Sequence, residues 1–291
     1  MEQVINELIF FILILLYFFL YKRYMKVALC FFGQPRLLNN PYTYLSHKHW
    51  ILDKYNTDIF IHSWINNTNE EFNYADQVKI KEKELKDSDK IILSKYKPKR
   101  YIFEKSRNFS LSEKNRNIIK QKIEQSESRW GGGNLNWSEN NENNHLSQLY
   151  SMSKSIELLQ DDYYDFVILS RFDSYIISIP NLYNLDKNEL YLSDIHYLNT
   201  IDCDRNTFSD ILIFGGLEEV KSLNCYNNID NLINDLEIFA PEDFKLLSYY
   251  SKFKHKIKGY SRNLNLPYGA EKRIKMRIGV VRTNDLNYLQ F

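Results

Sequence analysis

Residues 26–36 read KVALCFFGQPR. The first part of this stretch, up to Phe32, is an apolar run rich in residues that suit a buried strand, and GQPR at 33–36 is a turn signal. Residues 57–64, TDIFIHSW, form a second run of this kind, and the aromatic-rich segment 41–54 between them suits a helix that begins at Pro41. A strand, a helix and a strand in this order predict a parallel sheet.

The rest of the chain continues this alternation. Apolar residues recur at helical spacing between positions 143 and 161, which predicts a helix with one buried face. Residues 79–90 read KIKEKELKDSDK and predict a solvated helix, whereas the Asn-, Ser- and Glu-rich residues 106–144 predict a mobile region or an inserted loop. Further strands are expected at 99–103, 166–169, 189–192, 211–214 and 278–281, and further helices at 217–236 and 241–253.

Length and composition favour one globular enzyme domain. A chain of 291 residues can bury one sizeable core, so we expect a single α/β catalytic domain over residues 25–291, with a second domain left open. Lys and Arg number 38 against 37 for Asp and Glu, so no long-range field favours a nucleic acid partner. Cys30, Cys203 and Cys225 lack the spacing of a zinc site or disulfide framework, which fits a reducing compartment.

Residues 1–24 are expected to form a hydrophobic membrane anchor. Residues 4–21 include the uncharged run LIFFILILLYFFLY at 8–21 and would span about 27 Å as a helix. Because Lys22, Arg23 and Lys26 follow this run and acidic residues precede it, the positive-inside bias predicts a single-pass protein with a cytosolic catalytic domain. A cleaved signal peptide fits this charge order less well. The alternative that Met25 is the true start stays open.

Polar residues that directly follow apolar runs are the first candidates for a ligand site, because open α/β sheets bind ligands beyond the carboxyl ends of their strands. Three such places are GQPR at 33–36, His62 with Trp64, and RFD at 171–173. The turn offers backbone amides and the Arg36 guanidinium to a phosphate or a uracil-like base. It lacks the repeated glycines of a dinucleotide fingerprint or a P-loop.

Asp173 is the most informative of these residues. A carboxylate at the end of a central strand can hold a divalent cation, Mn²⁺ or Mg²⁺, which would stabilise charge on the departing diphosphate of a nucleotide-sugar. Arg171 can pair with the diphosphate, or else with Asp173 in a structural ion pair. A second acidic pair, Asp202 and Asp204, matches Asp-x-Asp but follows a polar loop, so a plain acidic loop is the favoured interpretation there.

Taken together, these stretches resemble a group of polysaccharide glycosyltransferases of large DNA viruses and of bacterial capsule and lipopolysaccharide clusters. The resemblance implies a GT-A-like fold, a Rossmann-type sheet that uses a nucleotide-sugar and usually a divalent metal. The motif here is Arg-x-Asp rather than Asp-x-Asp, and one carboxylate binds a cation more weakly than two. The resemblance rests on KVALCFFGQPR at 26–36, DIFIHSW at 58–64, SQLYSMSKSIELL at 147–159, YDFVILSRFDS at 164–174, SDILIFGG at 209–216 and PEDF at 241–244.

The resemblance also implies roles for single residues. Asp173 stands where the metal-binding Asp-x-Asp would be, and Asp210 is expected to line the sugar site. If transfer inverts the anomeric centre, Glu242 or Asp243 is the expected general base, although a carboxylate at a helix start also complements the helix dipole. The resemblance places Gly33 and Arg36 near the donor. Gln34, His62 and Arg171 are also expected to bind the donor, because they follow or end the predicted strands.

The sequence thus predicts a glycosyltransferase that transfers a sugar from a nucleotide-sugar donor to a glycan or related acceptor. The alternative is a membrane-anchored, non-catalytic nucleotide- or sugar-binding protein with a degenerate GT-A fold. A methyltransferase-like enzyme fits less well, because no glycine-rich loop follows the first strand.

Overall fold

The computed structural model describes residues 7, 9–12, 25–67, 71, 83–130, 139–192, 194–196, 211–224, 226–233, 257–258 and 277–280. In the first half of this part, strands and helices alternate. They are β1 (Lys26–Gly33), α2 (Pro41–His47), the π-helical turn η1 (Lys48–Leu52), β2 (Asn56–Trp64), α3 (Ser88–Tyr96), β3 (Arg100–Glu104), α4 (Glu113–Trp130) and α5 (Glu139–Glu157).

The second half contains shorter elements. They are β4 (Phe166–Arg171), β5 (Ser174–Ser178), η2 (Leu182–Asn184), β6 (Leu190–Leu192), β7 (Asp194–His196), β8 (Leu212–Gly215), α6 (Leu217–Lys221), η3 (Tyr226–Asn228), α7 (Ile229–Leu232), β9 (Ile257–Lys258) and β10 (Arg277–Val280).

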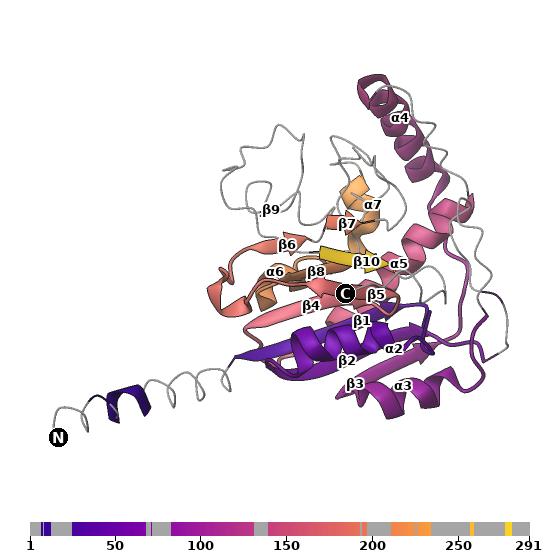
Figure 1. Cartoon of the computed structure of the whole chain (residues 1–291). Coiled ribbons are helices and arrows are strands. Elements are labelled where there is room, and N and C mark those ends of the chain that lie inside the picture. Colours follow the sequence, from indigo (N-terminus) through magenta and orange to yellow (C-terminus); the bar gives the residue numbers. More distant parts are fainter. Residues whose placement is uncertain are drawn as a thin grey trace.

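One mixed, mostly parallel sheet organises the described residues, in the strand order β3-β2-β1-β4-β8-β6-β9 (Figure 1). Strand β1 pairs in parallel with β2 on one side and with β4 on the other, and β2 pairs in parallel with β3. Strand β8 runs antiparallel to both β4 and β6. A smaller sheet has the order β5-β10-β7. The predicted α/β class, a mostly parallel sheet flanked by helices, is confirmed.

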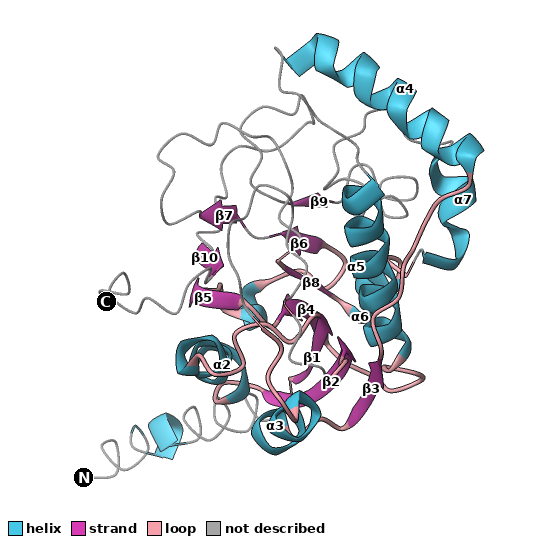
Figure 2. Ribbon diagram, turned by 90° about the vertical axis from the view of Figure 1, so that its right-hand side faces the viewer, coloured by secondary structure: helices cyan, strands magenta, loops and turns pink. Residues whose placement is uncertain are grey.

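The central strands are apolar on both faces because helices cover both faces. On β1, Val27, Leu29 and Phe31 belong to one buried cluster, with residues of α2 and α3, while Ala28, Cys30 and Phe32 belong to another, with residues of α5. Figure 2 shows α2 and α3 on one face of the sheet and α5 on the other. Period-two alternation along the strand thus feeds two separate cores.

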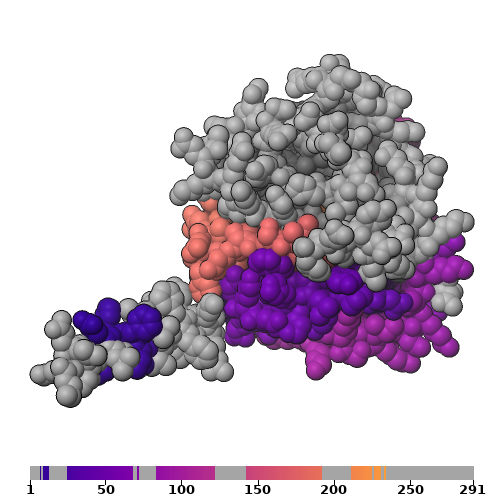
Figure 3. Space-filling model, in the orientation of Figure 1, coloured from indigo at the N-terminus to yellow at the C-terminus, as the bar shows by residue number. Residues whose placement is uncertain are grey.

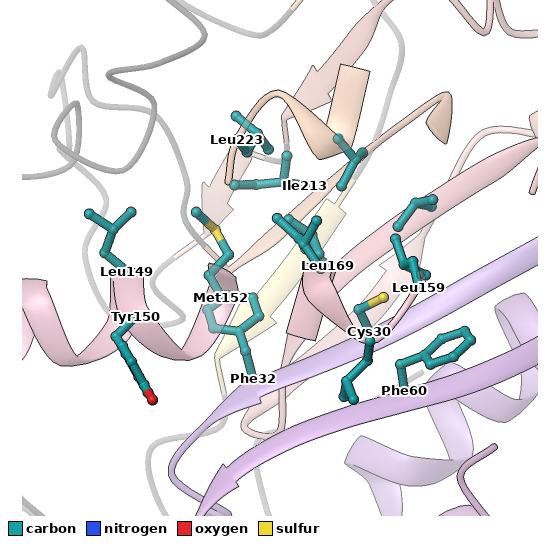
Figure 4. Packing of buried hydrophobic residues seen from close by; sticks show 14 of the residues in the cluster. Cys30, Phe32, Phe60, Leu149, Tyr150, Met152, Leu159, Leu169, Ile213 and Leu223 are labelled. Carbon is teal, nitrogen blue, oxygen red and sulfur yellow. The ribbon is translucent and has the colours of Figure 1, made fainter. Parts of the chain in front are cut away.

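The α5 core is drawn in close-up in Figure 4. Cys30 and Phe32 of β1 and Phe60 of β2 rise from the sheet, and Met152 of α5 lies above Phe32. Figure 3, in the orientation of Figure 1, shows purple residues from the early part of the chain in contact with the salmon-coloured residues that follow β4. The early and late parts of the described chain therefore form one packed body.

The start of α2 follows from its sequence. The Asn40 side chain caps the helix by accepting a hydrogen bond from the Tyr42 N–H at 2.9 Å, and Pro41 takes the first helical position, where its missing N–H costs nothing. The helix continues as the π-helical turn η1 to Leu52, so the predicted helix at 41–54 is confirmed, with wider i→i+5 hydrogen bonding in its second half.

Three expectations are wrong. The expected solvated helix at 79–90 is not helical at 83–87, because the buried Glu84 carboxylate accepts hydrogen bonds from the N–H groups of Asn66 and Asn67, and α3 begins only at Ser88. The expected loop at 106–144 contains helix α4, because the Lys, Gln, Glu and Arg residues of this segment favour a helix despite its Asn and Ser content. The expected helix at 217–236 is broken into α6 and α7. The Ser222 hydroxyl donates to the Glu219 carbonyl at 2.6 Å, a local bond that competes with helix continuation. The expected helix at 241–253 lies outside the described residues.

The expected membrane anchor at 1–24 stays a prediction. Of these residues the structure describes only 7 and 9–12, where Ile9, Phe10, Phe11 and Ile12 are exposed. None of the helices in the described ranges is long and apolar enough to cross a bilayer.

The central position of β4 gives a stability prediction. Leu169 is fully buried in the α5 core, whereas Leu45 on α2 is half exposed. We expect Leu169→Ala to lower the free energy of unfolding by about 2–5 kcal/mol, because it leaves a cavity, and Leu45→Ala to change it by less than about 0.5 kcal/mol. Urea denaturation of both variants measures this. Equal losses would contradict the placement of β4 in the core.

Candidate functional site

The parallel strands β1 and β4 lie at the point where the order of strands across the sheet reverses. From β1 the chain moves outward to β2 and β3, then returns through α5 to β4 on the other side of β1 (Figure 1). In open α/β sheets such a switch point leaves a crevice beyond the carboxyl ends of the two strands, where ligands bind. Phe32 of β1 pairs with His62 of β2 and with Arg171 of β4. The three predicted candidate segments therefore lie side by side at the carboxyl ends of neighbouring strands.

The GQPR turn directly follows β1. Gly33 has φ +97°, a conformation that side-chain-bearing residues rarely adopt, and no atom beyond its chain neighbours lies within 4 Å of where a Cβ atom would be. The Arg36 N–H donates to the Gln34 carbonyl at 2.8 Å, which closes a tight turn around Pro35. The Gln34 Oε1 atom also accepts hydrogen bonds from Arg36 Nε and Nη2, at 3.0 and 2.7 Å. Gln34 thus fixes the orientation of the Arg36 guanidinium.

Asp173 joins this turn to the end of β4. Its Oδ1 accepts a hydrogen bond from Arg171 Nε at 2.8 Å, and its Oδ2 accepts one from Arg171 Nη2 at 2.5 Å. The Arg36 Nη1 atom lies 3.6 Å from the same Oδ2. Two guanidinium groups from turns far apart in the sequence therefore meet on one carboxylate.

The charged groups at this point differ in exposure. The Asp173 side chain retains 3% of its accessible surface, and the side chains of Arg36 and Arg171 each retain 16%. The Asp173 carboxylate is therefore buried beneath the two arginines, and the surface that reaches solvent belongs mainly to their side chains. Anions rather than cations are the ligands that such a surface attracts.

The described residues do not fit a divalent cation at Asp173. Both carboxylate oxygens already accept hydrogen bonds from Arg171, and a cation bound there would lie against two positive charges. Within the described ranges no three His, Cys, Asp or Glu side chains are grouped to hold a metal ion. The structure thus shows the Arg171–Asp173 ion pair that the sequence left open as the alternative. Asp202 and Asp204 lie outside the described residues.

His62 does not face the crevice. It lies on the α5 side of the sheet, fully buried, with Nδ1 2.7 Å from Ser151 Oγ and Nε2 3.6 Å from Glu104 Oε1. Burial lowers the pKa of His62 to about 4, so its imidazole is neutral near pH 7. Its expected contact with the donor is corrected accordingly, since a fully buried ring has no surface to offer a ligand.

Ser151 of α5 connects His62 to the turn. Its Oγ accepts a hydrogen bond from the Gly33 N–H at 2.7 Å, and the Ser63 hydroxyl donates to the Gly33 carbonyl at 3.0 Å. Both polar groups of the Gly33 residue are thereby fixed by neighbouring elements. The role of His62 is to hold Ser151, and through it the turn that carries Arg36.

Trp64, singled out together with His62, belongs to the packing of the α5 side. Its ring stacks on Tyr150 at a centroid distance of 5.5 Å, and the Arg107 guanidinium lies 4.4 Å from the Tyr150 ring centroid. The Tyr150 hydroxyl donates to Glu104 Oε1 at 3.1 Å. This aromatic cluster braces α5 against the ends of β2 and β3.

A second buried histidine, His47 of α2, supports the turn after β4. Its Nδ1 lies 2.7 Å from the Thr43 carbonyl, which can only accept, so Nδ1 carries the proton and Nε2 accepts from the Ser170 hydroxyl at 2.8 Å. The Ser174 hydroxyl donates to the Arg171 carbonyl at 2.8 Å. Burial lowers the pKa of His47 to about 4. Its sequence neighbourhood gave no signal for this role, because its partners lie far away in the chain.

The remaining predicted residues, Asp210, Glu242 and Asp243, lie outside the described residues. Ile211, which follows Asp210, accepts a hydrogen bond from the Arg171 N–H at 3.2 Å. The described chain thus resumes directly beside the end of β4.

A comparison with models of known protein families finds no match, and none of the curated proteins compared matches the chain. The functional argument therefore depends on the fold and on the geometry of the switch point.

The two neutral histidines predict a loss of stability in mild acid. Their pKa is about 4 in the folded state and about 6.5 in the unfolded state, so the unfolded chain binds more protons between these values. The free energy of unfolding should be greatest above about pH 6.5 and should decrease towards pH 4, by up to about 3 kcal/mol for each histidine. Urea denaturation across this range measures the effect, and in His47→Gln the fall should be smaller. A flat profile would show that the folded protein does not lower the pKa of either histidine.

Ser151 gives a test of the turn support. We expect Ser151→Ala to accelerate hydrogen exchange of the Gly33 amide and to cost about 1–3 kcal/mol, because a buried N–H loses its acceptor. Ser155→Ala is the matched control, since Ser155 is equally buried on the same helix and its hydroxyl donates to the Met152 carbonyl within that helix. Unchanged exchange at Gly33 in Ser151→Ala would contradict the support.

Proposed function

We propose that the protein is a glycosyltransferase that transfers a sugar from a nucleotide-sugar donor to a glycan or related acceptor, on a GT-A-like fold. The observation that carries the proposal is the convergence of Arg36 and Arg171 on Asp173 at the switch point between β1 and β4. This is the place where open α/β sheets bind nucleotides.

The chemistry of a nucleotide-sugar suits this place. As the sugar departs from the donor, negative charge develops on the nucleoside diphosphate, and oriented positive groups stabilise that charge. Guanidinium groups match phosphate oxygens in shape and remain charged at any physiological pH. Arg36 and Arg171, held by hydrogen bonds before a ligand arrives, meet this requirement.

The acceptor side of the reaction needs a base. In an inverting transfer a carboxylate takes the proton of the acceptor hydroxyl as the hydroxyl oxygen attacks the anomeric carbon. In this proposal Glu242 or Asp243 has that role, and Asp210 lines the sugar site. Their support is the resemblance of SDILIFGG and PEDF to the glycosyltransferase group.

The proposal includes a location. Residues 4–21 would anchor the chain in a membrane, and Lys22, Arg23 and Lys26 on the following side favour a cytosolic catalytic domain. Nucleotide-sugars in the cytosol would then be used to build a glycan at the membrane surface.

A non-catalytic nucleotide- or sugar-binding protein is the second candidate. The observation that favours it is the engagement of Asp173 by two arginines, because the residue expected to hold a catalytic cation is occupied in another way. The two candidates differ in turnover and agree in binding.

A donor panel distinguishes them. The full chain in detergent micelles should hydrolyse or transfer at least one UDP-, GDP- or dTDP-sugar, and Asp173→Ala should lower the rate at least about tenfold, or about 1.4 kcal/mol. Asp53→Ala is the control, because Asp53 is an exposed carboxylate that pairs with Lys48 on the surface. Binding without turnover would favour the second candidate, and neither binding nor turnover would exclude both.

A further inference from the structure

Arg171 occupies both carboxylate oxygens of Asp173. The guanidinium of Arg171 grips the carboxylate with two parallel hydrogen bonds, of 2.8 and 2.5 Å. This fork geometry is the strongest and most directional that the two groups can form. A cation that replaced Arg171 on Asp173 would have to break both bonds and remain beside Arg36.

The second arginine is oriented independently of the first. Gln34 accepts hydrogen bonds from Nε and Nη2 of Arg36, which turns the Nη1 atom towards Asp173 Oδ2 at 3.6 Å. One carboxylate thus holds together two like charges that would otherwise repel each other. Asp173 is in this sense a positioning residue, which acts through the two arginines.

The space beside the turn also favours a phosphate. The absence of a side chain at Gly33, with no atom beyond its chain neighbours within 4 Å of the Cβ position, lets a ligand approach the backbone closely. Both arginine side chains keep some exposed surface, whereas Asp173 is sealed beneath them.

We propose that Arg36 and Arg171, aligned by Asp173, bind the diphosphate of a nucleoside diphosphate directly, without a divalent cation between protein and phosphate. This inference rests on the proposed function for its ligand class, and it concerns binding rather than transfer. The two guanidinium groups take the place that a metal ion has in a metal-dependent enzyme.

The test measures binding of UDP, GDP and dTDP to the full chain in detergent micelles by isothermal titration calorimetry, with either EDTA or Mn²⁺ present. At least one nucleoside diphosphate should bind in EDTA, and Mn²⁺ should change its Kd by no more than about twofold. Arg36→Gln and Arg171→Gln should each weaken binding in EDTA at least about tenfold. Asp173→Asn should also weaken it, with no rescue by Mn²⁺.

Arg100→Gln is the matched control. Arg100 pairs with Asp162 at 2.7 Å at the start of β3, an edge strand that β2 separates from β1, so its loss removes an arginine–carboxylate pair without touching the switch point. Its Kd should equal that of the unaltered protein. If Arg171→Gln fails to fold, Arg36→Gln still decides the matter, because the fork between Arg171 and Asp173 remains in that variant.

Three results would overturn the inference: binding that requires Mn²⁺, binding in EDTA that neither arginine substitution weakens, or binding of no nucleoside diphosphate at all. The proposed function fails separately. Metal-free binding without sugar turnover would leave this inference standing and remove the glycosyltransferase, whereas turnover that EDTA abolishes would do the reverse.

Discussion

The parallel pairing of β1 with β2 on one side and β4 on the other is the constraint on which the site depends. Because parallel neighbours need crossover connections, the chain leaves β1 through α2 on one face and reaches β4 through α5 on the other. The turns that follow β1 and β4 therefore face each other across the sheet edge. Arg36 and Asp173 come within ion-pair distance as a result of this topology, although most of the described chain separates them in sequence.

Each of the two turns is fixed by a buried, neutral histidine from a different layer. His62 and Ser151 hold Gly33 from the α5 side, and His47 with its serine partners holds the turn after β4 from the α2 side. A charged imidazole in either place would carry a large desolvation cost, which is why burial keeps both rings neutral. Both histidines therefore support the switch point without adding charge to it.

Local sequence patterns were enough to predict the central strands, the α5 helix and the positions of the three candidate places. The apolar run VALCFF, rich in strand-forming residues and followed by a turn signal, suits a strand that is buried on both faces of an α/β sheet, and β1 has this burial. The prediction of a loop at 106–144 is wrong because the segment contains, besides Asn and Ser, many residues that favour a helix. The role of His47 and the inward orientation of His62 depend on partners in α5 and β4, and no spacing within their own strands or helices encodes such contacts. Likewise, the sequence alone does not decide whether Asp173 binds a cation or pairs with Arg171, because this depends on how the two side chains are oriented at the end of β4.

The burial of Asp173 explains how two arginines can be kept ready for an anion. Two guanidinium groups at one site repel each other. Without a compensating charge, their side chains would turn towards solvent, because no interaction would offset the entropy lost by holding them in one conformation. The carboxylate offsets one of the two positive charges and fixes both groups by hydrogen bonds and an ion pair. A phosphate that arrives then meets donors already oriented, so little of its binding free energy is spent on reorganisation. The same carboxylate, exposed and unpaired, would repel that phosphate.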